Sequence, residues 1–216
     1  MLSSRVRGSA ATVVFLVAVV GLTACSNGGA GRAASTSTST TPPATFAGSS
    51  DLCPWFHGST TSLGSSGPTA PAFLVDATAG AQGCLDVVTF TFRTRGDGTP
   101  PGYSVAYRDA TKDPFKDGDV PIEVPGNAHL AVTIVPAAST DASIDGNPST
   151  YAGNLSLAYG DHHHLQIVRE LPDGKDAAGQ ETVNWVIGLD STRPFRVDRY
   201  EDGSQPGMTH VAVLIG

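Results

Sequence analysis

Charged side chains, and basic ones above all, are scarce in this sequence. They make up 15% of the 216 residues, against a usual share of about 25%. Thirteen Lys and Arg face twenty Asp and Glu, and the formal net charge is −7. Because affinity for nucleic acids depends on basic side chains that face phosphates, this composition excludes a nucleic-acid partner.

Helical periodicity and catalytic motifs are also missing. No window places apolar residues at i, i+3, i+4 and i+7, the spacing of an amphipathic helix. The sequence has no Gly-x-Ser-x-Gly, no His-Glu-x-x-His and no Ser-x-x-Lys with its companion motifs, so we assign no catalytic residue and no cofactor. The glycine-rich run 96–102 contains two prolines and precedes a strand. It therefore lacks the helix N-terminus that binds phosphate, and we interpret it as a hairpin loop.

An apolar run near the N-terminus has the length of a signal-peptide core. Residues 10–20 are apolar except for Thr12, and the run is too short for a membrane span of about 20 residues. Two arginines precede it, and Leu22-Thr23-Ala24-Cys25 follows, which resembles the lipobox of bacterial lipoproteins. The resemblance implies a signal peptide over 1–24, a lipid on Cys25 and attachment to the extracytoplasmic face of the cell membrane. The alternative is an ordinary secretory signal in which Cys25 has no role.

Cysteine is rare, with three residues in the chain. If Cys25 carries the lipid, Cys53 and Cys84 remain, and in an oxidising compartment we expect them to form a disulfide. On the chain-entropy model such a bridge contributes about 3–4 kcal/mol. Two free thiols or a metal-binding pair are the alternatives, but no second Cys-x-x-Cys or histidine stands at ligand spacing.

Composition divides the rest of the chain into three parts. Residues 25–50 contain almost no large apolar side chain and include a run of Ser, Thr and Pro, which predicts a flexible linker. Residues 51–83 are expected to be an irregular segment tied down by the disulfide. Residues 84–216 alternate apolar and polar side chains and form the predicted β-domain.

About eight short segments carry this alternation, and clusters of Gly, Pro, Asp and Asn separate them. The alternating apolar residues are Val88-Phe90-Phe92, Tyr103-Val105-Tyr107, Leu130-Val132-Ile134, Val183-Trp185-Ile187-Leu189, Phe195-Val197 and Val211-Val213-Ile215, with Ile122-Val124 and Leu165-Ile167 as weaker members. The pattern predicts an all-β fold, a single antiparallel β-sandwich or barrel. Trp185 alternates with core residues, so we expect it to be buried.

Several of these segments resemble the AMIN-like domain of bacterial envelope lipoproteins. The matching residues are 86–90, 101–107, 126–130, 136–138, 151–153, 185–190 and 194–197. The resemblance implies a β-sandwich, and the related AMIN domain of cell-wall amidases and pilus secretins is associated with the envelope and with peptidoglycan. The matched motifs carry no catalytic signature. The chain departs from the family pattern at Val87, where an arginine is usual, and at residues 209–213, which replace a more charged closing strand.

Two polar clusters are candidates for metal binding. On a strand, His162 and His164 would point to one face, but nothing in the sequence supplies a third ligand, so we interpret the cluster as an exposed turn. The segment that begins at Asp141 resembles the start of a calcium loop, yet Ala152 stands where a bidentate glutamate must be. We interpret it as a polar turn and assign no metal ligand.

Aromatic side chains remain as candidate ligand contacts. Trp55, Tyr107 and Tyr200 are the candidate residues for stacking against sugar rings, and Phe56 and Tyr159 are further aromatics of the same kind. Packing in the core or around the disulfide is the alternative for each of them.

The sequence as a whole predicts a lipid-anchored envelope protein that acts as a non-catalytic binding or scaffolding module. Its expected partners are the membrane, through the lipid on Cys25, and peptidoglycan or an envelope protein. The alternative is an envelope hydrolase whose acidic or histidine side chains converge only in the folded chain.

Overall fold

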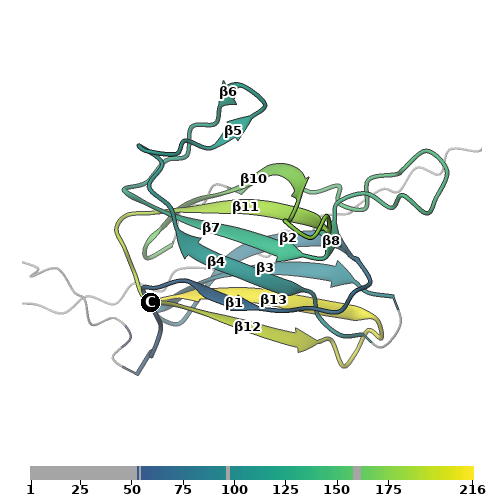
Figure 1. Ribbon diagram of the computed structural model, residues 1–216. Coiled ribbons are helices and arrows are strands. Elements are labelled where there is room, and N and C mark those ends of the chain that lie inside the picture. The colour runs from purple at the N-terminus through teal and green to yellow at the C-terminus, as the bar shows by residue number, and fades with distance from the viewer. Residues whose placement is uncertain (1–52, 54, 96–97, 158–161) are drawn as a thin grey trace, which may run out of the picture. The chain divides into compact units, whose positions relative to one another are not determined.

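The alternating segments form two β-sheets that pack face to face (Figure 1). The computed structural model describes residues 53, 55–95, 98–157 and 162–216, and within these ranges the secondary structure is strand and turn without helix. The six-stranded sheet has the order β1 (Leu63–Ser65), β4 (Gly102–Tyr107), β7 (Ala128–Val135), β11 (Glu181–Leu189), β10 (Leu165–Lys175) and β9 (Ser156–Leu157). The five-stranded sheet has the order β12 (Phe195–Glu201), β13 (Met208–Ile215), β3 (Leu85–Arg93), β2 (Ala72–Gln82) and β8 (Ala137–Ala138). The predicted all-β sandwich is confirmed.

The core lies between the two sheets and consists of the side chains that the alternation assigned to one face. Phe90 on β3 and Trp185 on β11 are fully buried and meet with ring centroids 5.4 Å apart. Tyr151, from the connection between β8 and β9, packs its ring edge against Trp185 at 5.8 Å. Burying such a side chain stabilises the fold by about 1.5–3 kcal/mol, so these contacts hold the sheets together.

Residues 51–83, expected to be irregular, contribute two strands, and this expectation is wrong. β2 is 11 residues long and pairs with β3 along most of its length. Its alternation is hidden for two reasons: the register shifts between Leu74 and Asp76, and small residues such as Ala77 and Gly80 occupy positions where large apolar side chains would reveal a strand. β2 is a strand because it pairs with β3, and the local sequence pattern carries no information about that pairing.

Two further expectations about connections are also wrong. β3 and β4, the strands on either side of the run 96–102, belong to different sheets and do not pair, so the interpretation of this run as a hairpin loop is wrong. Residues 122–124 are not a strand. They follow a small hairpin of β5 (Lys116–Asp117) and β6 (Val120–Pro121), and the Ile122 amide donates to the carbonyl of Phe115. Phe115 is buried against His129 on β7, and this contact holds the segment against the outer face of the six-stranded sheet.

The expected signal peptide 1–24, the lipid site Cys25 and the linker 25–50 lie outside the described residues, and so does Tyr159. Within the described ranges, no helix has the length and apolar character needed to cross a membrane.

Candidate functional site

The outer face of the five-stranded sheet carries the polar half of the alternation. Strand register places Tyr200, His210, Thr91 and Asp76 in one row across four strands. The next row consists of Asp198, Ala212, Thr89 and Thr78. We call these eight residues the threonine face. Its three threonine hydroxyls lie on two paired strands, so the face presents neighbouring hydrogen-bond donors and acceptors.

An aromatic stack stands at one end of the threonine face. The Tyr200 ring lies on the His210 imidazole, with centroids 4.8 Å apart and planes 24° apart, and Tyr200 remains 48% exposed. His210 Nδ1 is 3.1 Å from Thr91 Oγ1, and its Nε2 is 3.8 Å from Asp202 Oδ2. The Ser204 hydroxyl and amide, with His210 adding a smaller effect, hold the pKa of Asp202 below its usual value. These contacts fix the orientation of His210 beneath the tyrosine.

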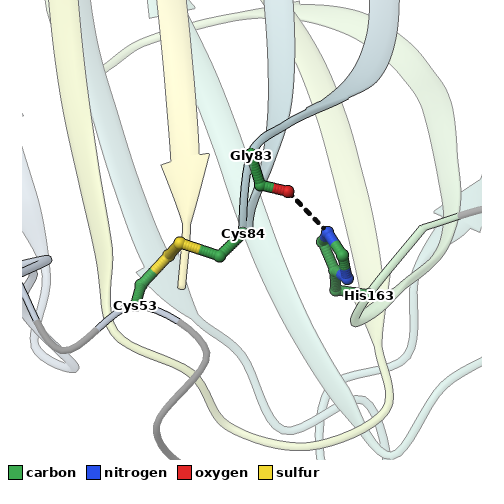
Figure 2. The surroundings of a disulfide bond; sticks show 4 residues. All are labelled: Cys53, Gly83, Cys84 and His163. Carbon is green, nitrogen blue, oxygen red and sulfur yellow. Dashed lines mark hydrogen bonds between the residues drawn. A yellow bond between two sulfur atoms is a disulfide. The ribbon is translucent and has the colours of Figure 1, made fainter.

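The disulfide stands at the other end of this face, where it joins Cys53 to Cys84 (Figure 2). This confirms the predicted pairing. Phe56, three residues after Cys53, packs against a small apolar cluster that includes Leu214 on β13, and the Arg196 guanidinium lies 5.8 Å from the Phe56 ring. Trp55 is 63% exposed. The bridge therefore attaches the start of the described domain, with its exposed tryptophan, to the β2–β3 turn.

Tyr107 lies elsewhere and makes structural contacts. Its hydroxyl donates to the Arg193 carbonyl at 2.7 Å and accepts from the Arg193 amide at 2.8 Å, and its ring meets Phe195 edge-on. Burial raises the pKa of the phenol. Tyr107 is half-buried and fastens the connection between β11 and β12, so it is not part of the threonine face.

The three histidines at 162–164 turn toward different partners. His162 Nδ1 is 3.3 Å from Asp86, His164 Nδ1 is 3.2 Å from Asp190, and His163 Nε2 is 3.0 Å from the Gly83 carbonyl (Figure 2). His162 and His164 therefore do not point to one common site. Their side chains are 7% and 6% exposed, so the expectation of an exposed turn is wrong for these two residues. Among the described residues, no three side chains of His, Cys, Asp or Glu are grouped so that they could hold a metal ion.

Asp86, which belongs to the first matched motif, has a structural role that the sequence did not reveal. Its carboxylate is fully buried and accepts hydrogen bonds from the backbone amides of His163, His164 and Leu165 at 3.0, 2.7 and 2.9 Å. A carboxylate on β3 thus holds the entry to β10, in the opposite sheet. The available signal was an aspartate near the start of a strand whose other residues on the same face are apolar. The amides that this aspartate binds lie about 80 residues further along the chain, so the signal did not identify them.

The segment that begins at Asp141 is a turn closed by arginine. Asp141 accepts from the Ser143 amide and hydroxyl and from Arg95 at 2.9 Å, and Arg93 lies at 3.6 Å. The Ser143 hydroxyl, followed by the Ser143 amide and Arg95, outweighs burial and lowers the pKa of the carboxyl. Its oxygens are therefore occupied by donors, as expected for a polar turn.

Comparison with known proteins adds one finding. The family model of the AMIN-like domain matches residues 72–212, from the first residue of β2 to the middle of β13. No curated protein and no solved structure matches the chain. The match begins 12 residues before the expected domain boundary at 84 and includes β2.

Proposed function

Because the chain belongs to the AMIN-like domain family, we propose that it is a membrane-anchored envelope lipoprotein whose sandwich binds the cell wall without catalysing a reaction. Membership suggests a module that binds peptidoglycan or is associated with the wall. The lipobox-like residues that end at Cys25 support the anchor, since cleavage there would leave a cysteine that can carry acyl chains. Two acyl chains hold a protein on a membrane where one binds only marginally.

The threonine face is the observation that carries the binding role. Sugar rings present hydroxyls on their rims and C–H groups on their faces. The hydroxyls of Thr78, Thr89 and Thr91 can exchange hydrogen bonds with the rim, and the exposed Tyr200 offers an amphipathic ring to the C–H groups. Recognition of this kind uses few charges, which suits a protein of net charge −7 near anionic wall polymers.

Sedimentation with purified sacculi tests this proposal. We expect the mature chain to co-sediment with sacculi, and Tyr200→Ala to reduce the bound fraction by about fivefold, because it removes the exposed ring. Leu155→Ser is the matched control, since Leu155 is exposed outside the threonine face. Raised salt should leave binding intact or strengthen it. Equal binding by the tyrosine variant would contradict the proposed face, and release of soluble wall fragments would favour the hydrolase alternative.

Membrane attachment has a separate test. Cys25→Ala should move the protein out of the membrane fraction, because no acyl chain can then be added, whereas Ser26→Ala should remain there. Intact-mass analysis of the wild type should find a diacylglyceryl group on an N-terminal Cys25. A mature N-terminus at any other residue would refute lipidation and leave an ordinary secretory signal.

A further inference from the structure

A groove runs along the edge of β10 beside the β5–β6 hairpin, which stands apart from both sheets in Figure 1. Its volume is about 570 Å3. Val120 on β6 and Leu155, which precedes β9, line it and are 67% and 65% exposed. They are two of the five large apolar side chains that the described residues leave exposed. Because two of these five side chains lie in a single groove, covering this surface would remove apolar area from water and lower the free energy.

The polar side chains of this groove are mostly acidic. Asp117 on β5 and Glu170 and Asp173 on β10 line it, and Arg169 is the basic residue among them. The Arg169 guanidinium donates to the Glu123 carbonyl at 3.1 Å, so part of its hydrogen-bonding capacity is already used. Three carboxylates and one guanidinium leave the groove with an excess of negative charge.

Glu170 is the residue most affected by this setting. It is half-buried, and burial, with a smaller contribution from Asp173, raises its pKa to about 7. The other charged residues that line the groove are Asp117 on β5 and Arg169 and Asp173 on β10, and of these Asp173 contributes to the raised pKa of Glu170. Its partner on β11 is Trp185, and its amide donates to Leu155 O, so those elements add no charge. A cation placed beside Glu170 would favour its ionised form.

The chemistry of the groove excludes several occupants. Anionic membranes and anionic wall polymers would be repelled by the excess of carboxylates. Among the described residues that line the groove none is aromatic, so these residues offer no platform for a sugar. Pro121 and Pro172, on its two walls, have no backbone N–H, which weakens pairing with an added strand. An occupant must therefore be recognised through apolar and cationic side chains.

We propose that this groove docks a segment of another envelope protein that carries a lysine or arginine between apolar side chains. The cationic group lies beside Glu170 and Asp117, and the apolar side chains cover Val120 and Leu155. This surface is separate from the threonine face, so the domain has two binding surfaces, one for the wall and one for a protein. The inference does not depend on wall binding.

Titration of the full mature chain with a capped heptapeptide tests this inference. The peptide carries one lysine between two leucines, flanked by glycine and serine. At pH 8 we expect it to bind about tenfold more tightly than a matched peptide with glutamate in place of lysine. Leu155→Ser and Glu170→Gln should each weaken binding by about fivefold. Ile144→Ser, which alters an exposed apolar residue outside the groove, should have no effect.

Two further measurements locate the site. Binding should tighten between pH 6 and pH 8 as Glu170 ionises, and Glu170→Gln should remove most of that dependence. Amide shifts in NMR spectra should move at residues 120 and 155. Equal binding of the lysine and glutamate peptides, no binding of either, or shifts confined to other surfaces would overturn the proposal. Leu155→Ser should still sediment with sacculi, so failure of this inference is distinguishable from failure of wall binding.

Discussion

Asp86→Ala should lower the free energy of unfolding by about 3–5 kcal/mol, because three backbone amides, two of them buried, lose a charged acceptor that nothing else replaces. Chemical denaturation monitored by tryptophan fluorescence measures the loss, since unfolding exposes Trp185, which is fully buried in the core. The effect should extend beyond residues 163–165, because this carboxylate links β3 to the start of β10 in the other sheet.

Asp86→Asn is the matched control for this substitution. It keeps the size of the side chain and one carbonyl acceptor, but it introduces an amide group that cannot accept the remaining hydrogen bonds. We therefore expect a loss between those of the wild type and the alanine variant. An alanine variant that unfolds within about 1 kcal/mol of the wild type would show that water or a rearranged turn satisfies the three amides.

Replacing both Cys53 and Cys84 by serine should cost about 3–4 kcal/mol of stability, because the bridge joins residues 31 positions apart and restricts the unfolded chain. The domain should still fold, since the core between the sheets contains neither cysteine. Thermal unfolding with and without a reducing agent measures the effect. Reduced wild type and the double variant should melt together, below the oxidised wild type.

Peptide mapping provides the control for the bridge itself. Under non-reducing conditions the peptides that contain Cys53 and Cys84 should be recovered as a linked pair. Alkylation of both thiols without prior reduction would contradict the bridge. Loss of the link should also loosen Phe56 from Leu214, because Cys53 and Phe56 belong to one cluster on the outer face of β13 and β3.

Much of the threonine face could be predicted from the alternation of apolar and polar residues along the strands. Once Phe90 and Val211 are assigned to the core, their neighbours Thr89, Thr91 and His210 must lie on the other face. Tyr200 was a candidate because of its ring, but its stacking on His210 was not predicted. The sequences of β12 and β13 do not by themselves show that these strands are neighbours in the sheet. The groove beside β10 was missed entirely, since its walls come from segments between residues 117 and 173.

The sequence by itself determined the all-β class, the alternating faces of the main strands, the burial of Trp185 and the pairing of Cys53 with Cys84. Each of these depends on local periodicity or on a count. Lipidation of Cys25 stays a prediction of the same kind. Only the tertiary structure decided that β2 is a strand, that Asp86 binds the backbone amides of residues 163–165, and that Glu170 lies half-buried near Asp173. The physical reason is that each of these features depends on contacts with residues distant in the chain. The order and register of the strands in the two sheets determine which residues make those contacts.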